Sequence, residues 1–436
     1  MWYEESVVYQ IYPLGACGAP IFNDGIKVNR IEKIYDYIPQ MQFLGVDTVL
    51  FNPLFESDKH GYDTRDYLNV DVRLGDNKAF KQLCERLHEE GFKIMLDGVF
   101  NHVGRGFWAF QDVIEKKQNS PYFDWFYLNM EGDSDYHDGF YYVGWEGVFD
   151  LVKLNLNNRE VVDYLLKAVK FWIDEFKIDG LRLDVGYSLD HEFVKTLRSY
   201  TTQLKPDFFL LGESLHGDYN QLMNDEMCHS VTNYECYKGI YSSFNSMNLF
   251  EINHSLLRQF GKDPWCLYRG KHLLNFVDNH DVTRIASILT NPKHIKLAYG
   301  LLFTMPGIPC IYYGSEWGSK GLKQDGDEAL RTYYETVETN TLTDFIANLS
   351  RVYHEHSALR YGEFESISLT NSQCVYARDD SSERLLVAIN ASGEPYMANF
   401  DAGCAQAEEL LSKQIVKMDA ERILEPYSIQ IWKLIL

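Results

Sequence analysis

The segment GLRLD occupies residues 180–184 and ends an apolar, strand-like run with an aspartate. Three other segments close an apolar run with an acidic residue or an Asn-His pair: DGVFNH (97–102), LLGES (210–214) and FVDNHD (276–281). Parallel strands of a barrel place their polar ends at one face, where barrel enzymes carry their functional residues. The four segments therefore predict a parallel barrel with acidic side chains gathered at one end.

Strand-like runs recur along the whole chain with helical patterns between them. This alternation is typical of an α/β protein with a (β/α)₈ TIM barrel. The eight runs are VVYQIYP (7–13), DTVLFNP (47–53), FKIMLDGV (92–99), GLRLDV (180–185), FFLLGE (208–213), SVTNY (230–234), LLNFVDN (273–279) and IPCIYYG (308–314).

Two of the intervening helices are readable in the sequence. Residues 77–91 repeat apolar side chains at helical spacing and end in a glycine, a residue that commonly follows a helix. Residues 160–176 have the same spacing, and Asn157 with Glu160 is expected to cap their start.

Two regions depart from the barrel pattern. Residues 103–155 are rich in aromatic residues, glycine and aspartate without helical periodicity, which predicts an inserted subdomain B after the third strand. From residue 362 onward, runs with a period of two predict a C-terminal antiparallel β-sandwich domain at 362–436. The catalytic barrel is then expected at 1–102 and 156–361, and all three parts should pack together.

Composition limits the classes of partner. The 436 residues include 63 acidic and 41 basic side chains, a net charge of −22, which opposes binding to nucleic acid or an anionic membrane. No window approaches eighteen uninterrupted apolar residues, and the N-terminus lacks the features of an export signal. The eight cysteines show no metal-binding spacing, so we interpret them as reduced core residues of a cytoplasmic protein.

The acids at the strand ends suit glycoside hydrolysis. That reaction needs a carboxylic acid to protonate the leaving oxygen and a carboxylate to attack or to activate water. Asp184 lies two residues beyond Arg182, whose guanidinium is expected to keep it ionised as a nucleophile. Glu213 follows an apolar run and suits a general acid and base, and Asp281 would counter developing positive charge.

Simpler interpretations exist for each residue alone. An acid at a strand end is often a solvated loop residue or a helix cap, and a lone His102 or His280 is more often structural. It is the joint occurrence at four strand ends that favours an active site.

These residues also match a known family, because the chain resembles the α-amylase family of glycoside hydrolases over essentially its whole length. DGVFNH, GLRLD, GES and FVDNHD are similar to the four family regions in order. Two flanking segments resemble the family's second and eighth strand signatures: LGVDTVLFNPLF (44–55) and GIPCIYYGSEWG (307–318).

The resemblance implies a retaining α-glucoside hydrolase. Asp184 would be the nucleophile, Glu213 the acid and base, and Asp281 the transition-state stabiliser. By the same resemblance, Tyr62 would stack beneath the reacting sugar. The residues that hold this sugar would be His102, Arg182 and His280. Asp63 and Arg331 would pair to close its subsite. Arg331 lies in a variable loop, where a plain surface arginine is equally compatible with the sequence.

Substrate and assembly follow from finer features. VKLN (152–155) resembles a fifth region found near the cyclomaltodextrinase, neopullulanase and maltogenic amylase group, which favours α-1,4-linked maltooligosaccharides, cyclodextrins and starch fragments. VGYS (185–188) lacks the Lys-His pair with which many α-amylases bind leaving-group sugars and calcium, so a different subsite is expected there. The predicted barrel begins within ten residues of Met1, which leaves no room for the N-terminal domain through which cyclomaltodextrinases dimerise, so a monomer is favoured.

No cofactor is assigned. Asn101 resembles a calcium ligand of the family, so a structural calcium stays open, but the loop LGACGAPIFNDG (14–25) lacks the six or more oxygens that calcium needs.

Two other functions compete with hydrolysis. A 4-α-glucanotransferase would use the same covalent intermediate and resolve it with a sugar hydroxyl instead of water. A non-catalytic glucan-binding protein is a remote alternative, because all three acids are present.

Overall fold

Eight parallel strands form the centre of the protein, of which the computed structural model describes residues 1–435. They are β1 (Val8–Ile11), β2 (Thr48–Phe51), β5 (Lys93–Gly98), β11 (Gly180–Leu183), β12 (Phe209–Gly212), β13 (Ser230–Val231), β14 (Leu274–Phe276) and β15 (Ile308–Tyr312). Their spatial order is β13-β12-β11-β5-β2-β1-β15-β14, and a parallel bridge between Thr232 and Leu274 joins the two outer strands. All eight predicted runs thus contribute a strand, and the TIM barrel is confirmed.

Side chains along each barrel strand alternate between two apolar layers. Val8 and Leu50 belong to a cluster inside the barrel, whereas their neighbours Tyr9 and Val49 pack in the larger core between strands and helices. A residue two positions beyond an inward side chain also points inward. The polar residues that end the strands therefore reach the mouth of the barrel.

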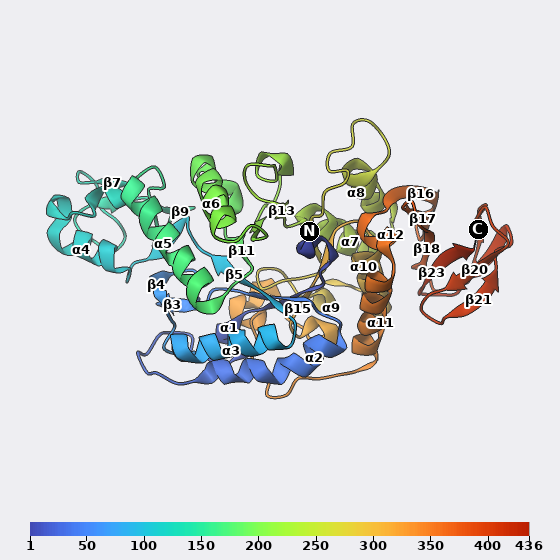
Figure 1. Ribbon diagram of the computed structural model, residues 1–436, viewed down its shortest axis with the longest axis horizontal. Coiled ribbons are helices and arrows are strands. Elements are labelled where there is room, and N and C mark those ends of the chain that lie inside the picture. Colours follow the sequence, from blue (N-terminus) through green and yellow to red (C-terminus); the bar gives the residue numbers. More distant parts are fainter. Residues whose placement is uncertain (436) are drawn as a thin grey trace.

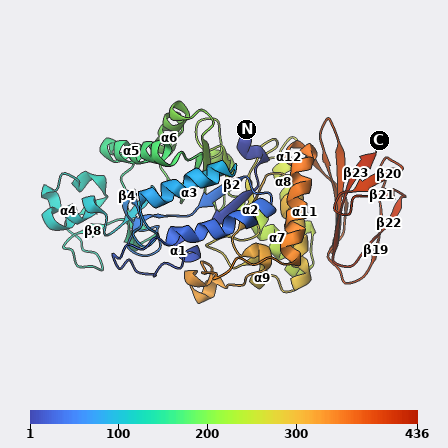
Figure 2. The same ribbon diagram turned by 60° about the horizontal axis from the view of Figure 1, so that its bottom comes forward.

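Helices surround the barrel, and Figure 2 shows α2, α3 and α11 side by side along one flank. The helices are α1 (Pro13–Ala16), α2 (Ile38–Phe43), α3 (Asn77–Glu89), α5 (Arg159–Phe176), α6 (His191–Leu204), α7 (Tyr234–Ser246), α8 (Phe250–Phe260), α9 (Ile285–Ile288), α10 (Ile295–Thr304), α11 (Thr341–Glu355) and α12 (Ser357–Tyr361). Both helices predicted in the sequence are confirmed, as α3 and α5.

The predicted cap of α5 is wrong by one residue. Asn158, not Asn157, accepts a hydrogen bond from the amide of Glu160, at 2.8 Å. Asn157 lies in the preceding turn, where its own amide donates to Asn155 Oδ1 at 3.2 Å. The Glu160 carboxylate instead accepts a hydrogen bond from Trp125 Nε1 at 3.1 Å.

The segment between β5 and α5 lies at one end of the elongated molecule (Figure 1). Residues 103–155 do contain a helical pattern, because α4 (Trp108–Lys116) buries Ala109, Phe110 and Val113 at helical spacing. The strands of this region are the antiparallel sheet β6 (His102–Gly104), β10 (Val148–Lys153) and β9 (Gly144–Trp145), the pair β7 (Leu128–Asn129) and β8 (Tyr141–Tyr142), and the neighbouring pair β3 (Phe55–Ser57) and β4 (Thr64–Val70). The domain boundaries themselves stay predictions.

The C-terminal region is antiparallel and lies at the opposite end of the molecule (Figure 1). One sheet has the order β16 (Glu363–Leu369), β17 (Gln373–Asp379), β18 (Arg384–Asn390), β23 (Ser428–Ile435), β20 (Gln406–Glu409) and β21 (Gln414–Lys417), and β19 (Tyr396–Asn399) pairs with β22 (Glu421–Leu424). The buried Arg378 joins this region to the barrel, because its Nη1 donates to the carbonyl of Thr304 at 2.8 Å. The predicted C-terminal antiparallel domain is confirmed.

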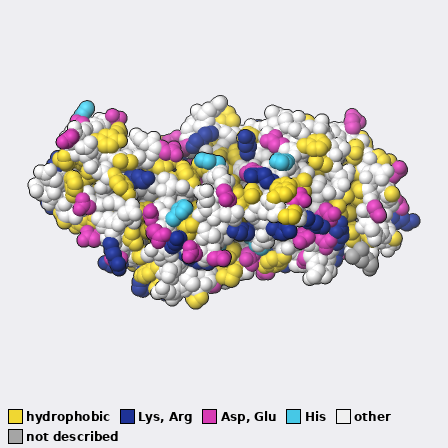
Figure 3. Space-filling view, turned by 90° about the horizontal axis from the view of Figure 1, so that it is seen from above, with side chains coloured by type: hydrophobic (Ala, Val, Ile, Leu, Met, Phe, Trp, Pro, Cys, Tyr) yellow, Lys and Arg dark blue, Asp and Glu magenta, His cyan; other side chains and the backbone are white. Residues whose placement is uncertain are grey.

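The surface mixes charges of both signs. On the face shown in Figure 3, Lys and Arg side chains are interspersed with Asp and Glu. Within residues 1–435, no helix is long and apolar enough to cross a membrane. All eight cysteine thiols are free, and six of them are buried.

Candidate active site

The end of β11 delivers Arg182 and Asp184 into the barrel mouth. Leu181 and Leu183 of the same strand pack in the core between strands and helices, so the alternation of side chains turns Arg182 and Asp184 inward. The same rule applies to β12, where Leu210 faces the helices and Glu213 faces the mouth. Asp184 and Glu213 are both buried, at 5% and 6% exposure.

Arg182 contacts three carboxylates at once. Its Nη1 lies 2.7 Å from Asp97 Oδ2 and 3.1 Å from Asp184 Oδ1, and its Nη2 lies 2.6 Å from Glu213 Oε1. One guanidinium carries a single positive charge, so three carboxylates exceed its capacity for neutralisation. We name the side of the site formed by Asp97, Arg182, Asp184 and Glu213 the Asp184 wall.

This excess of acid decides the protonation of the Asp184 wall. Burial raises the pKa of Asp184 well above its usual value; Arg182 acts against this rise, and the carboxylates of Glu213, Asp97 and Asp281 add to it. Arg182 lowers the pKa of Asp184, as expected, but burial and the three carboxylates outweigh it. Asp184 therefore keeps a proton at pH values where a free aspartate has lost its own.

A strained turn fixes the two acids relative to each other. Val185 follows Asp184 with φ +49°, a left-handed conformation that a β-branched residue rarely adopts. In this conformation its amide donates a hydrogen bond to Glu213 Oε2 at 2.9 Å. Strain of this kind persists only where the surrounding structure enforces it, and it clusters at functional sites.

Asp281 lies on the opposite side of the site, next to His280 and Arg331. Its Oδ2 is 2.9 Å from His280 Nε2 and its Oδ1 is 2.9 Å from Arg331 Nη2. Arg331 also contacts Asp327 Oδ2 at 3.2 Å. Burial would raise the pKa of Asp281, but His280, Arg331 and Arg182 together hold it well below its usual value. We name Asp281, Arg331 and Asp327 the Asp281 wall.

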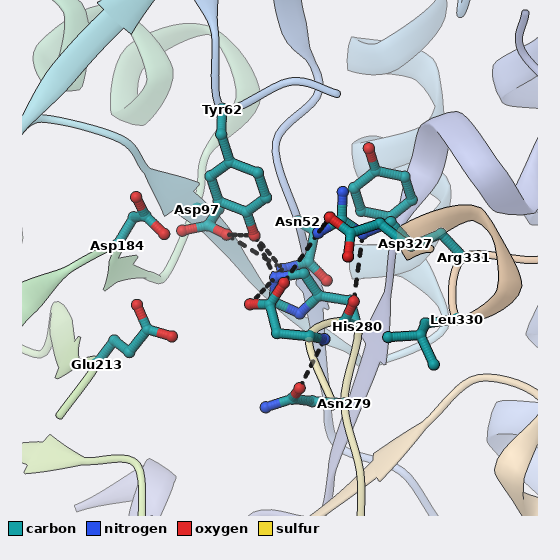
Figure 4. A network of polar contacts seen from close by, with 12 residues as sticks. Asn52, Tyr62, Asp97, Asp184, Glu213, Asn279, His280, Asp327, Leu330 and Arg331 are labelled. Carbon is teal, nitrogen blue, oxygen red and sulfur yellow. Dashed lines mark hydrogen bonds and ion pairs between the residues drawn. The ribbon is translucent and has the colours of Figure 1, made fainter. Parts of the chain in front are cut away.

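Tyr62 and His280 lie between the two walls (Figure 4). Their rings are stacked with centroids 5.6 Å apart, and the Tyr62 hydroxyl donates to Asp97 Oδ2 at 3.0 Å and contacts His280 Nε2. Gln10 Nε2 lies 3.0 Å from His280 Nδ1, and Asn52 Nδ2 donates to Asp97 Oδ2 at 3.1 Å. Neither Gln10 nor Asn52 was singled out in the sequence, although each lies two positions beyond an inward apolar residue, which is a readable signal.

His102 presents a free ring nitrogen to the site. Its Nδ1 lies 3.2 Å from Asn101 Nδ2, and its buried Nε2 has no hydrogen-bond partner within residues 1–435. Burial lowers the pKa of His102 to about 3, so the ring is neutral. With Nδ1 accepting from Asn101, Nε2 carries the proton, 4.0 Å from Asp184 Oδ2. This geometry leaves one donor available for a bound hydroxyl.

A cavity of about 470 Å³ opens between the walls. Six of the nine predicted site residues line it, and they are Asp184, Glu213, Asp281, Tyr62, His102 and Arg331. Val185 and Tyr187 also line it and belong to VGYS, where a different subsite was expected. The lining residues that the sequence analysis missed are His60, Trp145, Leu151, Leu215, Tyr234, Val282, Lys323 and Asp327. A second cavity of about 880 Å³ shares His60, Asp327 and Arg331 with the first.

Three predicted residues lie behind the cavity surface. Arg182 and His280 are 3% and 1% exposed. Arg182 contacts Asp184 and Glu213, and His280 contacts Asp281. The expected pair of Asp63 and Arg331 is not formed in the described chain. Asp63 instead accepts hydrogen bonds from the amides of His60 and Gly61, both at 3.1 Å, and so shapes the loop before Tyr62. Arg331 is buried at 9% exposure, and its carboxylate partners are Asp281 and Asp327.

A metal finds little support in this arrangement. Asn101 Oδ1 is buried without a hydrogen-bond partner among residues 1–435, as a metal ligand would be. However, the described residues contain no group of three or more His, Cys, Asp or Glu side chains that could hold a metal ion. We derive no chemistry from a metal.

Comparisons with known proteins agree with this geometry. A family model described as the catalytic domain of alpha amylase matches residues 24–357. A cyclomaltodextrinase from a Bacillus species is 31% identical over 416 residues, which cover 89% of this chain and 73% of the relative.

Solved structures show the same relationship. A structure of a cyclomaltodextrinase superposes with a TM-score of 0.87 at 29% identity and covers 99% of this chain and 78% of its own. The cyclic α-maltosyl-(1→6)-maltose hydrolase of Arthrobacter globiformis superposes with a TM-score of 0.83 at 26% identity over 100% of both chains. The chain therefore belongs to the α-amylase family of glycoside hydrolases.

Proposed function

We propose that this glycosidase is a retaining enzyme that cleaves α-1,4-glucosidic bonds in maltooligosaccharides, cyclodextrins or starch fragments. One observation carries the proposal: Asp184 and Glu213 share one guanidinium on one side of the cavity, and Asp281 is ion-paired on the other. The names of the cyclomaltodextrinase relatives support the choice of substrate.

The reaction begins with the protonated Glu213 and the ionised Asp184. Asp184 attacks the anomeric carbon and forms a glycosyl-enzyme ester, while the bond to the leaving oxygen breaks and that oxygen takes the proton of Glu213. The Glu213 carboxylate then removes a proton from water, which displaces Asp184 with a second inversion.

The remaining residues would position the sugar. Asp281 stays ionised in its cationic surroundings and would stabilise the oxocarbenium-like transition state. Tyr62 would stack on the sugar ring, and His102 Nε2 would donate to a sugar hydroxyl. Arg182 and His280 would act through Asp184 and Asp281, which they contact, and Asp63 would hold the loop that carries Tyr62. The second cavity, beyond Arg331, offers room for further glucose units.

Location and assembly remain proposals of the same kind. Eight free thiols support a reducing compartment such as the cytoplasm. A monomer stays the expected state, which light scattering of the purified protein would test.

A digestion series tests the proposed function. The purified protein is incubated separately with β-cyclodextrin, maltotriose, soluble starch and pullulan, and the first anomer released is identified by NMR. We expect α-anomers and products shorter than the substrate. A β-anomer released first would contradict the retaining mechanism.

Glucan transfer is a second candidate, because Trp145, Tyr187 and Tyr234 line the cavity and aromatic rings can hold a sugar acceptor. In the same series, products longer than maltotriose as the main outcome would favour a 4-α-glucanotransferase. Failure to cleave any glucan would favour a non-catalytic binding protein.

A further inference from the structure

The loop that carries Arg331 has little secondary structure of its own. Residues 318–334 contain only two short 3₁₀ turns, Lys323–Asp325 and Asp327–Ala329, between β15 and α11. Arg331 is nevertheless buried, and its Nη2 lies 2.9 Å from Asp281 Oδ1. Contacts from elsewhere in the chain must therefore hold this loop in place.

The residues directly after Asp281 supply such contacts. Thr283 Oγ1 accepts a hydrogen bond from the amide of Lys323 at 3.0 Å. The amide of Arg284 donates to the carbonyl of Gly321 at 3.0 Å. The first part of the loop therefore lies along the segment that follows the aspartate.

The side chain of Arg284 connects this segment to the backbone next to Arg331. It is fully buried, and its Nη2 donates to the carbonyl of Leu330 at 2.7 Å. Its Nη1 donates to the carbonyl of Tyr313, directly after β15, at 2.6 Å. A planar guanidinium can reach two acceptors through separate nitrogens. Arg284 thus ties the loop to the end of a barrel strand.

A buried carboxylate helps to fix the orientation of Arg284. Arg284 Nη1 also donates to Ser315 Oγ at 3.1 Å, and the Ser315 hydroxyl donates to Asp278 Oδ2 at 2.8 Å. The same Asp278 oxygen accepts a hydrogen bond from the amide of Ile285 at 2.7 Å. A buried charge is costly unless it is hydrogen-bonded and compensated, so this chain of contacts favours one position of the guanidinium.

The backbone of Arg331 is held by further contacts. The carbonyl of Leu330 accepts a second hydrogen bond from the Tyr312 hydroxyl at 2.9 Å. A Cβ atom on Gly15 would lie 1.9 Å from the Arg331 carbonyl oxygen, so α1 packs directly on this backbone. Figure 4 shows Leu330 and Arg331 on the same side of His280. The Arg331 side chain therefore extends into the cavity from a fixed backbone.

We propose that Arg284 is a positioning residue for the reaction, which keeps Arg331 in contact with Asp281 by holding the carbonyl that precedes Arg331. The proposal rests on the role that the proposed function gives to Asp281. Among the described residues, Arg284 is not part of the cavity lining, so it acts through Arg331 and not on the sugar. Without Arg284, the loop is released from the end of β15 and the ion pair weakens.

A weaker ion pair has a defined consequence for Asp281. Arg331 is one of the groups that lower the pKa of Asp281, so this pKa rises when Arg331 is displaced. The other charged and titratable groups around Asp281 are His280, Arg182, Asp184, Tyr62, Tyr234 and, beyond Arg331, Asp327 with Lys323. Within residues 1–435, the Arg284 side chain forms a hydrogen bond with none of them. A shift after its substitution therefore reports on Arg331.

The test compares two buried arginines. Arg284→Lys keeps the positive charge but offers one nitrogen, which cannot hold both carbonyls. We expect the acid limb of the pH profile of kcat/KM for maltotriose to move upward, with a loss of about tenfold at pH 5. Arg378→Lys is the matched control, because Arg378 is also fully buried and donates to the carbonyls of Gly362 and Thr304. It should lower the melting temperature and leave the acid limb in place.

A double-mutant cycle separates positioning from a general loss of structure. In the Arg331→Met background, Arg284→Lys should move the acid limb no further, because the contact that Arg284 positions is already lost. Tyr312→Phe removes only the second hydrogen bond to the Leu330 carbonyl and should cause a smaller shift in the same direction. This variant provides the measurement if Arg284→Lys fails to fold.

The outcomes distinguish this role from the proposed function. An acid limb at the wild-type position in both Arg284→Lys and Tyr312→Phe would overturn the positioning role, as would an equal shift with and without Arg331. In either case, cleavage of maltotriose by the wild type leaves the proposed function standing. A wild-type protein that cleaves neither maltotriose nor β-cyclodextrin would overturn both.

Discussion

The two walls of the cavity hold carboxylates in opposite electrostatic surroundings. On the Asp184 wall, three acids share the single guanidinium of Arg182. On the Asp281 wall, one acid contacts both His280 and Arg331. Burial and acidic neighbours raise the pKa of Asp184, whereas the cations lower the pKa of Asp281 despite burial. Within one small cavity, the charges next to each buried aspartate thus decide the direction in which its pKa moves.

This difference suits a division of labour. The Asp184 wall, where three acids share one guanidinium, favours a bound proton, whereas Arg331 and the other groups that lower the pKa of Asp281 keep its negative charge facing the sugar. Neither property follows from the identity of the residues, because both walls use aspartate.

Removal of the acids is expected to have the largest effect. Asp184→Asn should lower kcat/KM for maltotriose by about 10⁴-fold or more, since the nucleophile is lost. Asp281→Asn should cost about 10²- to 10³-fold, because only stabilisation of charge is lost. Steady-state kinetics and thermal melting of both variants provide the measurement. Asp174→Asn, at an exposed position on α5, is the control, and a larger loss in Asp281→Asn would reverse the assignment of the walls.

Loss of the Arg331 guanidinium from the Asp281 wall should lower kcat/KM by a smaller factor and should shift the pH profile in one direction. Arg331→Met removes a positive partner, so the pKa of Asp281 rises and its charge is lost at higher pH than in the wild type. We expect kcat/KM to fall about tenfold and the acid limb of the pH profile to move upward. Arg331→Lys should keep most of the activity. An unchanged acid limb in Arg331→Met would argue against Arg331 as the partner that matters.

Loss of an acid from the Asp184 wall should shift the acid limb of the pH profile in the opposite direction. Asp97 is one of the carboxylates that raise the pKa of Asp184. Asp97→Asn should therefore lower that pKa and move the acid limb downward by about one pH unit or less. The measurement is kcat/KM for α-glucosyl fluoride from pH 4 to pH 8. An upward shift would mean that Asp97 mainly orients Arg182.

Glu316 is another buried carboxylate, and it forms no ion pair within residues 1–435. Glu316 accepts a hydrogen bond from the Tyr9 hydroxyl, and burial raises its pKa to about 7 from 4.5. The folded state therefore holds this proton more tightly than the unfolded state does. Its contribution to the free energy of unfolding is fully present below pH 4.5 and is lost as the pH rises to 7, on the order of 3 kcal/mol.

Glu316→Gln tests this contribution, because the amide does not titrate. Urea denaturation at pH 5 and pH 7.5 should show that wild-type stability falls relative to the variant over this interval. A wild type that gains stability relative to the variant would mean that Glu316 is held as an anion.

The sequence by itself determined the barrel, its eight strands and the position of the three acids along the chain. These features depend on local patterns: strand-like runs, acidic residues at their ends, and an alternation that turns Asp184 and Glu213 inward together. The same alternation could have identified Gln10 and Asn52. The predicted cap of α5 was wrong by one residue, because the sequence has neighbouring asparagines and only the turn selects Asn158.

The tertiary structure decided which groups meet. Arg182 contacts Asp97 from 85 residues away, and Arg331 contacts Asp281 from 50 residues away, so no local pattern reveals how acids and cations are shared. Loops have no periodicity, so their contacts could not be predicted from the sequence. Asp63 binds amides of its own loop, and Asp327 contacts Arg331. Tyr187 contacts Glu146. Each pKa depends on burial and on every nearby charge, so the opposite pKa shifts of Asp184 and Asp281 arise only when the chain is folded.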